Sequence, residues 1–553
     1  MRKPEIILNI FNQRSKNDLI IKDVYKCFYN EEFYKMAFSN LTDNKNLLDE
    51  NNKEYYNRVL RIIDLIKLEQ YKWNKIKDLS KVRLNCGFNR NLIVSEWNNK
   101  IVQNIMYDIL FNIYEPIFSD RSHYARPNKG IHTALTQISN KGQANEFFIY
   151  CKIPDIVNSI NNNYLILLDI LRQKINDGRF IELIRKMFVA DKFKLDFYNY
   201  KTYSDTLTGG TLSPLLLNIY LNELDKFIKN NFESKFNVGA IREKNKDYRH
   251  ICDKKERLSN KLKNKRGSLS NSEIIEIQKE IKELQNKIRK MPTRASIELC
   301  KYRRFSYTRY CNEWIISFTG TFNEANEIKN KINNFLKNVL NLSAEINIKN
   351  STNKKDPARF LNYNIVTQYS SSYIVQNKRR IAGIITFMIP NDIITKFIKK
   401  YSKNNKPIHL PERINDSVFD IISQYQYEYE GICQYYKFAR NKKKLNKLNH
   451  VIQSSLLKTL SYKLKKSTTK VVKMLRGTFV IDNFTYKTIS TTITSEDGTV
   501  YETHFGAVPL KHKNVSNYDP IDDEVRNLFS KRTNKSNRLI YIKCSMCDSN
   551  KDI

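Results

Sequence analysis

Apolar positions along the chain repeat with helical spacing in several segments. Val59, Ile62, Ile63 and Ile66 fall at i, i+3, i+4 and i+7, which predicts a helix with one apolar face. The same period predicts further helices over 101–118, 164–188 (as one or two helices), 213–232 and 323–340. At the start of 213–232, the Ser-Pro pair predicts Ser213 as the N-cap and Pro214 as the first helical residue.

Other segments carry the composition of strands. The run FFIYCKI over 147–153 is rich in β-forming residues, and 304–321 predicts a strand pair around Cys311, Asn312 and Glu313. A Thr-rich, strand-like stretch follows Gly477. Between these segments, 254–290 predicts a charged helical hairpin broken at 266–268. Helices and strands together predict an α+β fold.

The charge balance narrows the class of partner. Lys and Arg number 95 against 57 Asp and Glu, a net charge of +38, which argues against an ordinary small-molecule enzyme and favours a polyanion such as nucleic acid. No apolar run approaches the ~18–20 residues that cross a bilayer, so no membrane partner is expected. Nine cysteines, an odd number, do not form a disulfide framework.

One segment carries a specific motif. Thr208 to Phe227, TGGTLSPLLLNIYLNELDKF, closely resembles the block G-G-x-L-S-P-L-L-x-N-I-Y-L-x-x-L-D of reverse transcriptases encoded by group II introns. Further blocks of that family occur in its order, at 89–92, 100–103, 114–135, 174–190, 358–363, 421–441 and 457–470. The resemblance covers roughly residues 20 to 477. It implies a right-hand polymerase, with reverse-transcriptase fingers and palm followed by a helical thumb, the maturase domain X.

The resemblance divides the chain into four parts. We expect an N-terminal helical extension over 1–80, fingers and palm over 81–370 with a helical insertion near 242–291, and thumb and domain X over 371–477. Residues 478–553 then form a degenerate C-terminal tail, a remnant of the family's H-N-H endonuclease region. For the inserted helices, a solvated pair is the first interpretation, and a coiled-coil partner or an RNA-clamping arm is the alternative.

The polymerase site of the family lacks its acids here. The family binds two divalent metals with three aspartates, one on a first palm strand and two in a Y-A-D-D hairpin. Lys152, Asn312 and Glu313 stand at these degenerate positions, so an ammonium and an amide replace two carboxylates. Asp155 is a poor substitute, because positions i and i+3 of a strand face opposite sides. We expect no catalytic residues, no bound metal and no cofactor. A misplaced register near 151–163 is the alternative, and it would not restore Asn312.

The endonuclease chemistry is also eroded. Cys544 and Cys547 resemble the opening C-x-x-C of the H-N-H region, but a tetrahedral zinc site needs two more ligands. Two free cysteines are the simpler interpretation.

The RNA-binding character of the family is retained. Basic side chains attract phosphates, and aromatic rings stack on unpaired bases. The candidate RNA-binding residues are Arg126, Lys129, Tyr435, Tyr436, Arg440, Lys443, Lys458, Lys463, Lys465 and Lys466. Core positions for Tyr425, Tyr429 and Tyr436, and a solvated face for the lysines, are the alternatives. One departure from the family is Glu430, which stands where a basic residue is usual.

These features predict an intron maturase. Its partner is a group II, or related group III, intron RNA, whose ribozyme fold it stabilises for splicing, and no small-molecule substrate is expected. Whether the protein forms a homodimer is left open. The alternatives are an RNA-directed DNA polymerase with weak activity through unconventional metal ligation, and a general RNA-binding relic. Frequent Asn, Lys, Ile and Tyr suggest an A/T-rich organellar genome, a plastid (chloroplast) before a mitochondrion.

Overall fold

The computed structural model describes residues 2–41, 53–73, 77–78, 93–94, 97–190, 212–264, 270–291, 293–299, 301–369, 374–375, 378–379, 382–481, 483–494 and 500–510. The chain folds as two compact units. One comprises residues 1–133, 155–223 and 388–553, and the other comprises residues 134–154 and 224–387. Both units mix helices with strands, so the predicted α+β class is confirmed.

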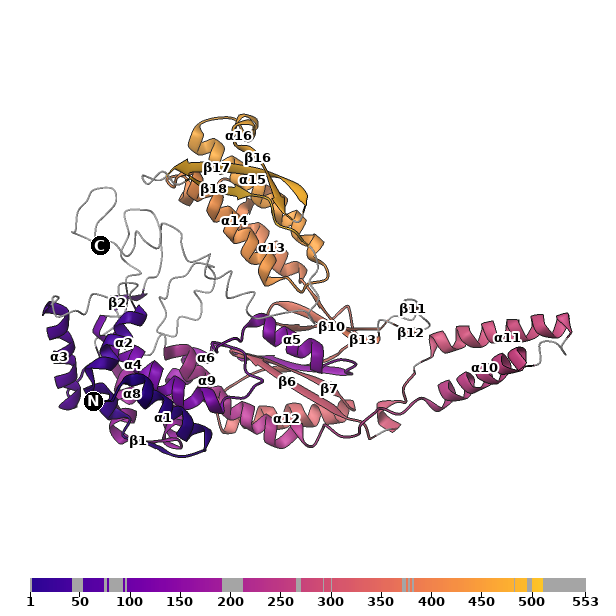
Figure 1. The fold of residues 1–553 in the computed structure, drawn as a ribbon, viewed down its shortest axis with the longest axis horizontal. Coiled ribbons are helices and arrows are strands. Elements are labelled where there is room, and N and C mark those ends of the chain that lie inside the picture. Colours follow the sequence, from indigo (N-terminus) through magenta and orange to yellow (C-terminus); the bar gives the residue numbers. More distant parts are fainter. Residues whose placement is uncertain are drawn as a thin grey trace. The chain divides into compact units, whose positions relative to one another are not determined.

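A four-stranded antiparallel sheet is the centre of the second unit. Its strands are β4 (Phe147–Lys152), β6 (Arg304–Tyr310), β7 (Glu313–Thr319) and β8 (Ile346–Asn350), in the order β6-β7-β4-β8. Helix α12 (Phe322–Asn338) packs on this sheet against β4 and β8 (Figure 1). It begins at a capping box formed by Thr321 and Glu324. The predicted strand pair and the helix after it are therefore confirmed.

Two smaller elements complete this unit. Strands β9 (Ala358–Phe360), β10 (Tyr363–Tyr369) and β13 (Ala382–Met388) form a second sheet in the order β13-β10-β9. Helices α10 (Lys246–Asn264) and α11 (Asn271–Lys290) lie side by side (Figure 1) and are joined by the Lys254–Glu280 ion pair at 2.9 Å. The predicted helical hairpin is confirmed, although it begins at Lys246 rather than at Lys254. Its predicted break lies outside the described residues.

The long helix α9 (Leu212–Ile228) carries a buried acid that holds the β6–β7 hairpin. The side chains of Asp225 and Arg309 are both 0% exposed and lie 2.7 Å apart at their closest atoms. Arg309 donates to both carboxylate oxygens, and the Tyr307 hydroxyl donates to Oδ1 at 2.8 Å. Burial disfavours the charged guanidinium, but Asp225 outweighs this effect and raises the pKa of Arg309.

Helices dominate the N-terminal part of the first unit. They are α1 (Pro4–Lys16), α2 (Glu31–Leu41), α3 (Lys53–Lys67), α4 (Trp97–Tyr114), α5 (Ile131–Lys141, which continues into the second unit), α6 (Ile156–Asn162), α7 (Tyr164–Arg172) and α8 (Gly178–Ala190). The four apolar residues predicted to share one face of α3 are all buried. A short parallel pair joins β1 (Ile21–Lys22) to β5 (Ile175–Asn176). The segment predicted as one or two helices over 164–188 is two, since β5 separates them.

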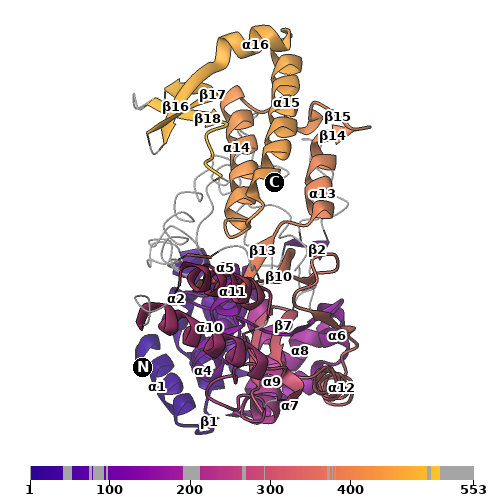
Figure 2. The same ribbon diagram turned by 90° about the vertical axis from the view of Figure 1, so that its right-hand side faces the viewer.

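The C-terminal module of the first unit is formed by residues 389–510. Its helices are α13 (Asn391–Tyr401), α14 (Val418–Tyr435), α15 (Leu445–Leu464) and α16 (Thr468–Leu475). A short pair, β14 (Ser402–Lys403) and β15 (Lys406–Pro407), follows α13. An antiparallel sheet of β16 (Arg476–Ile481), β17 (Phe484–Thr494) and β18 (Val500–Phe505) packs on α14 (Figure 2).

Two boundaries differ from the sequence expectations. Helix α9 already begins at Leu212, so Ser213 is a helical residue and not the N-cap. The boundary expected at 477/478 falls inside β16, and the sheet is bonded to α14. The Gly506 N–H donates to Gln426, and the hydroxyls of Ser423 and Thr503 lie 2.8 Å apart. Residues up to Phe505 therefore belong to this module rather than to a frayed tail.

The buried ion pair predicts a large effect of Asp225→Asn. The amide keeps the size of the side chain but leaves the Arg309 guanidinium buried without a counter-charge, which costs about 3–5 kcal/mol. Urea denaturation should show an earlier unfolding step, and hydrogen exchange should show lost protection of the β6 and β7 amides.

The matched control is Asp169→Asn, which removes the exposed pair with Arg172 and should cost less than about 1 kcal/mol. Equal, small effects of the two substitutions would contradict a structural role for the buried pair.

Candidate functional site

The structure brings together, at one end of the four-stranded sheet, the three residues that the sequence analysis predicts at the polymerase metal positions. Cys311 and Asn312 form the two-residue turn between β6 and β7, with Cys311 at φ 56°. Glu313 opens β7 and stands opposite Lys152, the last residue of β4. Three residues from two distant parts of the sequence therefore share one site.

The carboxylate of Glu313 is held on both of its oxygens. Oε1 lies 2.8 Å from the Lys152 ammonium, and Oε2 accepts the Leu361 N–H at 2.8 Å. Leu361 and Asn362 are the turn of the β9–β10 hairpin and have φ values of 49° and 56°. Asn tolerates this left-handed conformation better than most residues that have a side chain. Glu313 is thus a structural anchor between two hairpins.

Asn312 fastens its turn to the end of β4. The side-chain amide of Asn312 donates to the Ile153 carbonyl at 2.7 Å. The backbone carbonyl of Asn312 accepts the Ile153 N–H at 3.0 Å. An aspartate could not donate the first of these bonds when ionised, and its charge would face a carbonyl oxygen. The amide therefore suits this position better than the acid that the family carries.

The remaining groups near the turn do not supply a substitute site. Asp155 lies outside β4, at the N-cap of α6, where it accepts two hydrogen bonds from Asn158, each at 2.9 Å. Burial raises the pKa of the Cys311 and Cys151 thiols to about 12, so neither is a thiolate nucleophile at neutral pH.

Two-metal chemistry requires several hard carboxylate oxygens that converge on the ions. Here the hairpin offers one carboxylate, already paired with an ammonium, so the residues present do not fit such a pair of metals. Within the part of the chain that the structure describes, no three His, Cys, Asp or Glu side chains could hold a metal ion. Cys544 and Cys547 lie outside the described residues.

In the C-terminal module, three donors hold one acid, Glu428, whose side chain is 26% exposed, and four of the nine tyrosines are buried. Glu428 accepts hydrogen bonds from Lys400, Arg413 and Tyr401. Burial alone would raise the pKa of Glu428, but the charges of Arg413 and Lys400 outweigh it and lower that pKa. Tyr425, Tyr429 and Tyr436 are also buried, as the alternative interpretation proposed. The ring of Tyr436 is 2% exposed, so Tyr436 is a core residue and does not offer RNA a surface.

The surface of the same module is basic. Between Gly431 and Ile481 the sequence has thirteen Lys and Arg residues and no Asp or Glu. Of the candidate RNA-binding residues, five are exposed and two, Tyr435 and Lys463, are partly exposed. The exposed ones are Arg440, Lys443, Lys458, Lys465 and Lys466. Lys447, another lysine of this basic stretch, is also exposed on α15. The structure adds one residue that sequence reasoning missed, Tyr462, which is exposed on α15 one helical turn after Lys458.

Two further candidates have structural partners. The guanidinium of Arg126 pairs with Glu115 at 2.9 Å and donates to the carbonyls of Ser119 and Ser122, and its side chain is only 5% exposed. Lys129 donates to the Asp120 carbonyl, and burial and the nearby Arg126 lower its pKa. We therefore assign Arg126 and Lys129 to holding their loop together and leave them out of the basic surface.

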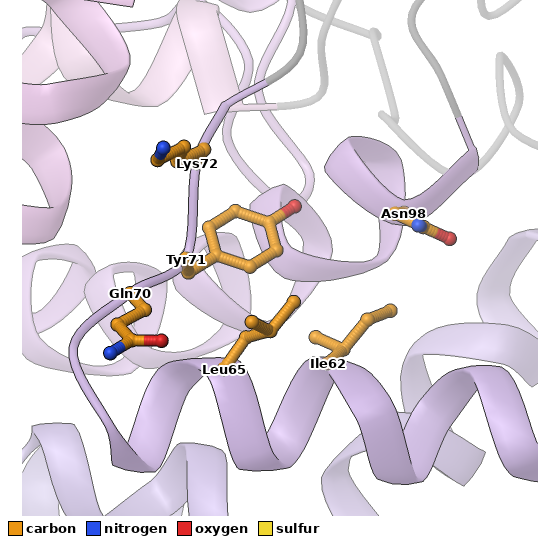
Figure 3. A pocket seen from close by; sticks show the side chains of 6 residues that line it. All are labelled: Ile62, Leu65, Gln70, Tyr71, Lys72 and Asn98. Atoms are coloured by element: carbon orange, nitrogen blue, oxygen red, sulfur yellow. The ribbon is translucent and has the colours of Figure 1, made fainter.

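A hollow of about 500 Å³ lies among the N-terminal helices. It is lined by Ile62, Leu65, Gln70, Tyr71, Lys72 and Asn98 (Figure 3). The side chains of Ile62 and Leu65 point from α3 toward the ring of Tyr71 (Figure 3). The lining has no carboxylate, cysteine or histidine, so it provides neither a metal site nor an acid–base pair.

Comparison with known proteins identifies the family. A model of the type II intron maturase matches residues 391–544. The group II intron-encoded protein LtrA of Lactococcus lactis is 30% identical over 482 residues, which cover 84% of this chain and 78% of LtrA. The chain belongs to the group II intron-encoded protein family. Its C-terminal module is accordingly maturase domain X, and the family predicted from the sequence is confirmed.

Two yeast proteins are similar to this chain over most of its length. The COX1/OXI3 intron 2 protein of Saccharomyces cerevisiae is 27% identical over 95% of this chain, and the 91 kDa protein in a cob intron of Schizosaccharomyces pombe is 28% identical over 84%. The chain spans 59% and 58% of their lengths. Neither a yeast nor a bacterium has a plastid, so these relatives do not support the expectation of a plastid over a mitochondrion. No helix among the described residues is long and apolar enough to cross a membrane.

The Asn312 contacts predict that restoring the family's acid by Asn312→Asp destabilises the fold. The substitution loses a donor to the Ile153 carbonyl and should cost about 1–3 kcal/mol at pH 7 in urea denaturation. Because the carbonyl raises the pKa of the new carboxyl above its unfolded value of about 3.9, the loss should be smaller at pH 5 than at pH 7.

Asn286→Asp on the exposed face of α11 makes the same chemical change and should stay within about 0.5 kcal/mol at both pH values. A stabilising effect of Asn312→Asp would show that the amide is not adapted to this turn.

Proposed function

We propose that this protein is a maturase that binds a group II intron RNA and promotes its splicing by stabilising the folded ribozyme. A ligand that binds only the folded state shifts folding toward it, so the protein needs affinity for the RNA and no bond chemistry of its own. The observation that carries the proposal is the acid-free basic stretch of domain X from Gly431 to Ile481, on which Arg440, Lys443, Lys458, Lys465 and Lys466 are exposed.

We also propose that the polymerase and endonuclease activities of the family are absent. In this interpretation, residues 81–370 are reverse-transcriptase fingers and palm, and residues 371–477 are the thumb and domain X. The family's metal positions are then Lys152, Asn312 and Glu313. The ion pair of Lys152 with Glu313 and the bonds of Asn312 to Ile153 support this proposal, because each uses a former metal position for a structural contact.

The basic surface predicts a salt-dependent RNA affinity that depends on particular lysines. The triple variant Lys443→Gln, Lys447→Gln and Lys465→Gln should bind the host intron found by crosslinking more weakly. Its slope of log affinity against log salt should fall by roughly 0.7–0.9 per lost phosphate contact. Splicing of that intron at near-physiological salt should slow in parallel.

The control removes the same charge from α10 with Lys246→Gln, Lys261→Gln and Lys263→Gln, which should leave splicing unchanged. If wild-type protein leaves splicing unchanged, or crosslinks spread over ribosomal RNA, the proposed function is wrong.

The absent polymerase predicts no primer extension above background with Mg²⁺ or Mn²⁺, and no change with Glu313→Ala. Glu313 keeps one carboxylate, so a weak activity through it is the competing function. An extension product that Glu313→Ala abolishes would establish that competing function.

A further inference from the structure

Two aromatic rings lie stacked at the surface of domain X. The rings of His409 and Tyr462 are nearly coplanar, with 3° between their planes and 4.9 Å between their centroids. Tyr462 is in the last turn of α15. His409 is in the segment that follows β15, and the β14–β15 pair lies beside α13 and α15 (Figure 2). The side chain of Tyr462 is 61% exposed. With His409 against one side of the ring, this exposure leaves the other side open to solvent.

The segment that carries His409 is fixed to α15 on both sides of the histidine. Four residues of α15, one helical turn or less apart, bond to backbone groups of residues 407–414. The pairs are Ser455 with the Ile408 carbonyl at 2.6 Å, Lys458 with the Pro407 carbonyl at 2.7 Å, Thr459 with the Leu410 N–H at 3.0 Å and Lys463 with the Ile414 carbonyl at 2.9 Å. The two rings are therefore held together before any ligand binds, which lowers the entropy cost of binding on them.

Four lysines lie within four residues of Tyr462 in the sequence. Lys458 lies one helical turn before Tyr462, and Lys463 follows it directly. An ammonium has three N–H donors, so a bond to one backbone carbonyl leaves two for a phosphate. Lys465 and Lys466 are exposed just beyond the helix end. The acid of the 407–414 segment is Glu412, and α15 itself has none.

We infer that Tyr462, backed by His409, is a stacking platform for an unpaired RNA base, with Lys458 and Lys463 contacting the adjoining phosphates. Bases inside an A-form duplex already stack on their neighbours, so only a looped-out or single-stranded nucleotide can use the ring. This inference rests on the proposed function and adds the chemical class of the ligand: a flexible, unpaired segment of the RNA rather than its helices.

The experiment compares two fluorescent RNA probes, a ten-nucleotide single strand that contains one 2-aminopurine and a blunt-ended duplex of the same strand with its complement. Tyr462→Ala in the full chain should weaken binding of the single strand about 5- to 150-fold, the contribution of one base stacked on an aromatic ring. Binding of the duplex should change less than about twofold, and the salt dependence should stay as in the wild type.

Three further measurements separate stacking from charge and from misfolding. Tyr462→Phe keeps the ring and should bind the single strand like the wild type. Tyr427→Ala removes a tyrosine that is 45% exposed on α14 and should have no effect. Quenching of 2-aminopurine should occur with the wild type and Tyr462→Phe but not with Tyr462→Ala, whose thermal unfolding should match that of the wild type.

The outcomes distinguish this inference from the proposed function. If Tyr462→Ala binds the single strand as well as the wild type does, or Tyr427→Ala loses as much affinity, the stacking platform is wrong and the maturase proposal stands. If the wild type binds neither probe nor intron RNA near physiological salt, the maturase proposal fails and the platform fails with it.

Discussion

The buried pair of Asp225 and Arg309 is the constraint around which the β6–β7 hairpin is arranged. An isolated charge in that environment would be strongly unfavourable, so α9 and β6 must meet in a geometry that satisfies both groups. Arg309 also donates to the Cys311 carbonyl at 3.2 Å, which extends the constraint into the turn itself. The turn is therefore positioned by protein groups alone. A hairpin that does not depend on metal ions for its shape can lose metal ligands without losing its fold.

The two units use charge in different ways. In the second unit, opposite charges meet at the hairpin and in the buried pair, and they set the geometry of the backbone. In domain X, three donors hold the acid Glu428, while the stretch from Gly431 to Ile481 has thirteen cations and no acid. A stretch with cations and no acid has a positive field, which attracts a polyanion at long range.

Much of this architecture follows from local sequence patterns. Periodicity predicts α3, α4 and α12, and the β-forming runs predict β4, β6 and β7, because these elements expose one face to a core and repeat accordingly. The family blocks predict that Lys152, Asn312 and Glu313 share one site. The partners of Arg126 were not predictable, and for Tyr436 a core and a surface position both stayed open, since a basic or aromatic residue can face either the core or the solvent. Nor was the packing of β17 and β18 on α14, which depends on contacts about 80 residues apart.

The fastening of Asn312 to Ile153 has a consequence for the history of the chain. A change toward the family's acids would pass through Asn312→Asp or Lys152→Asp. The first loses the hydrogen bond to the Ile153 carbonyl, and the second places a new carboxylate next to that of Glu313. Each first step lowers stability, and neither alone completes a metal site. Under the proposed function, selection for folding alone therefore disfavours each single substitution toward the family's acids at this turn.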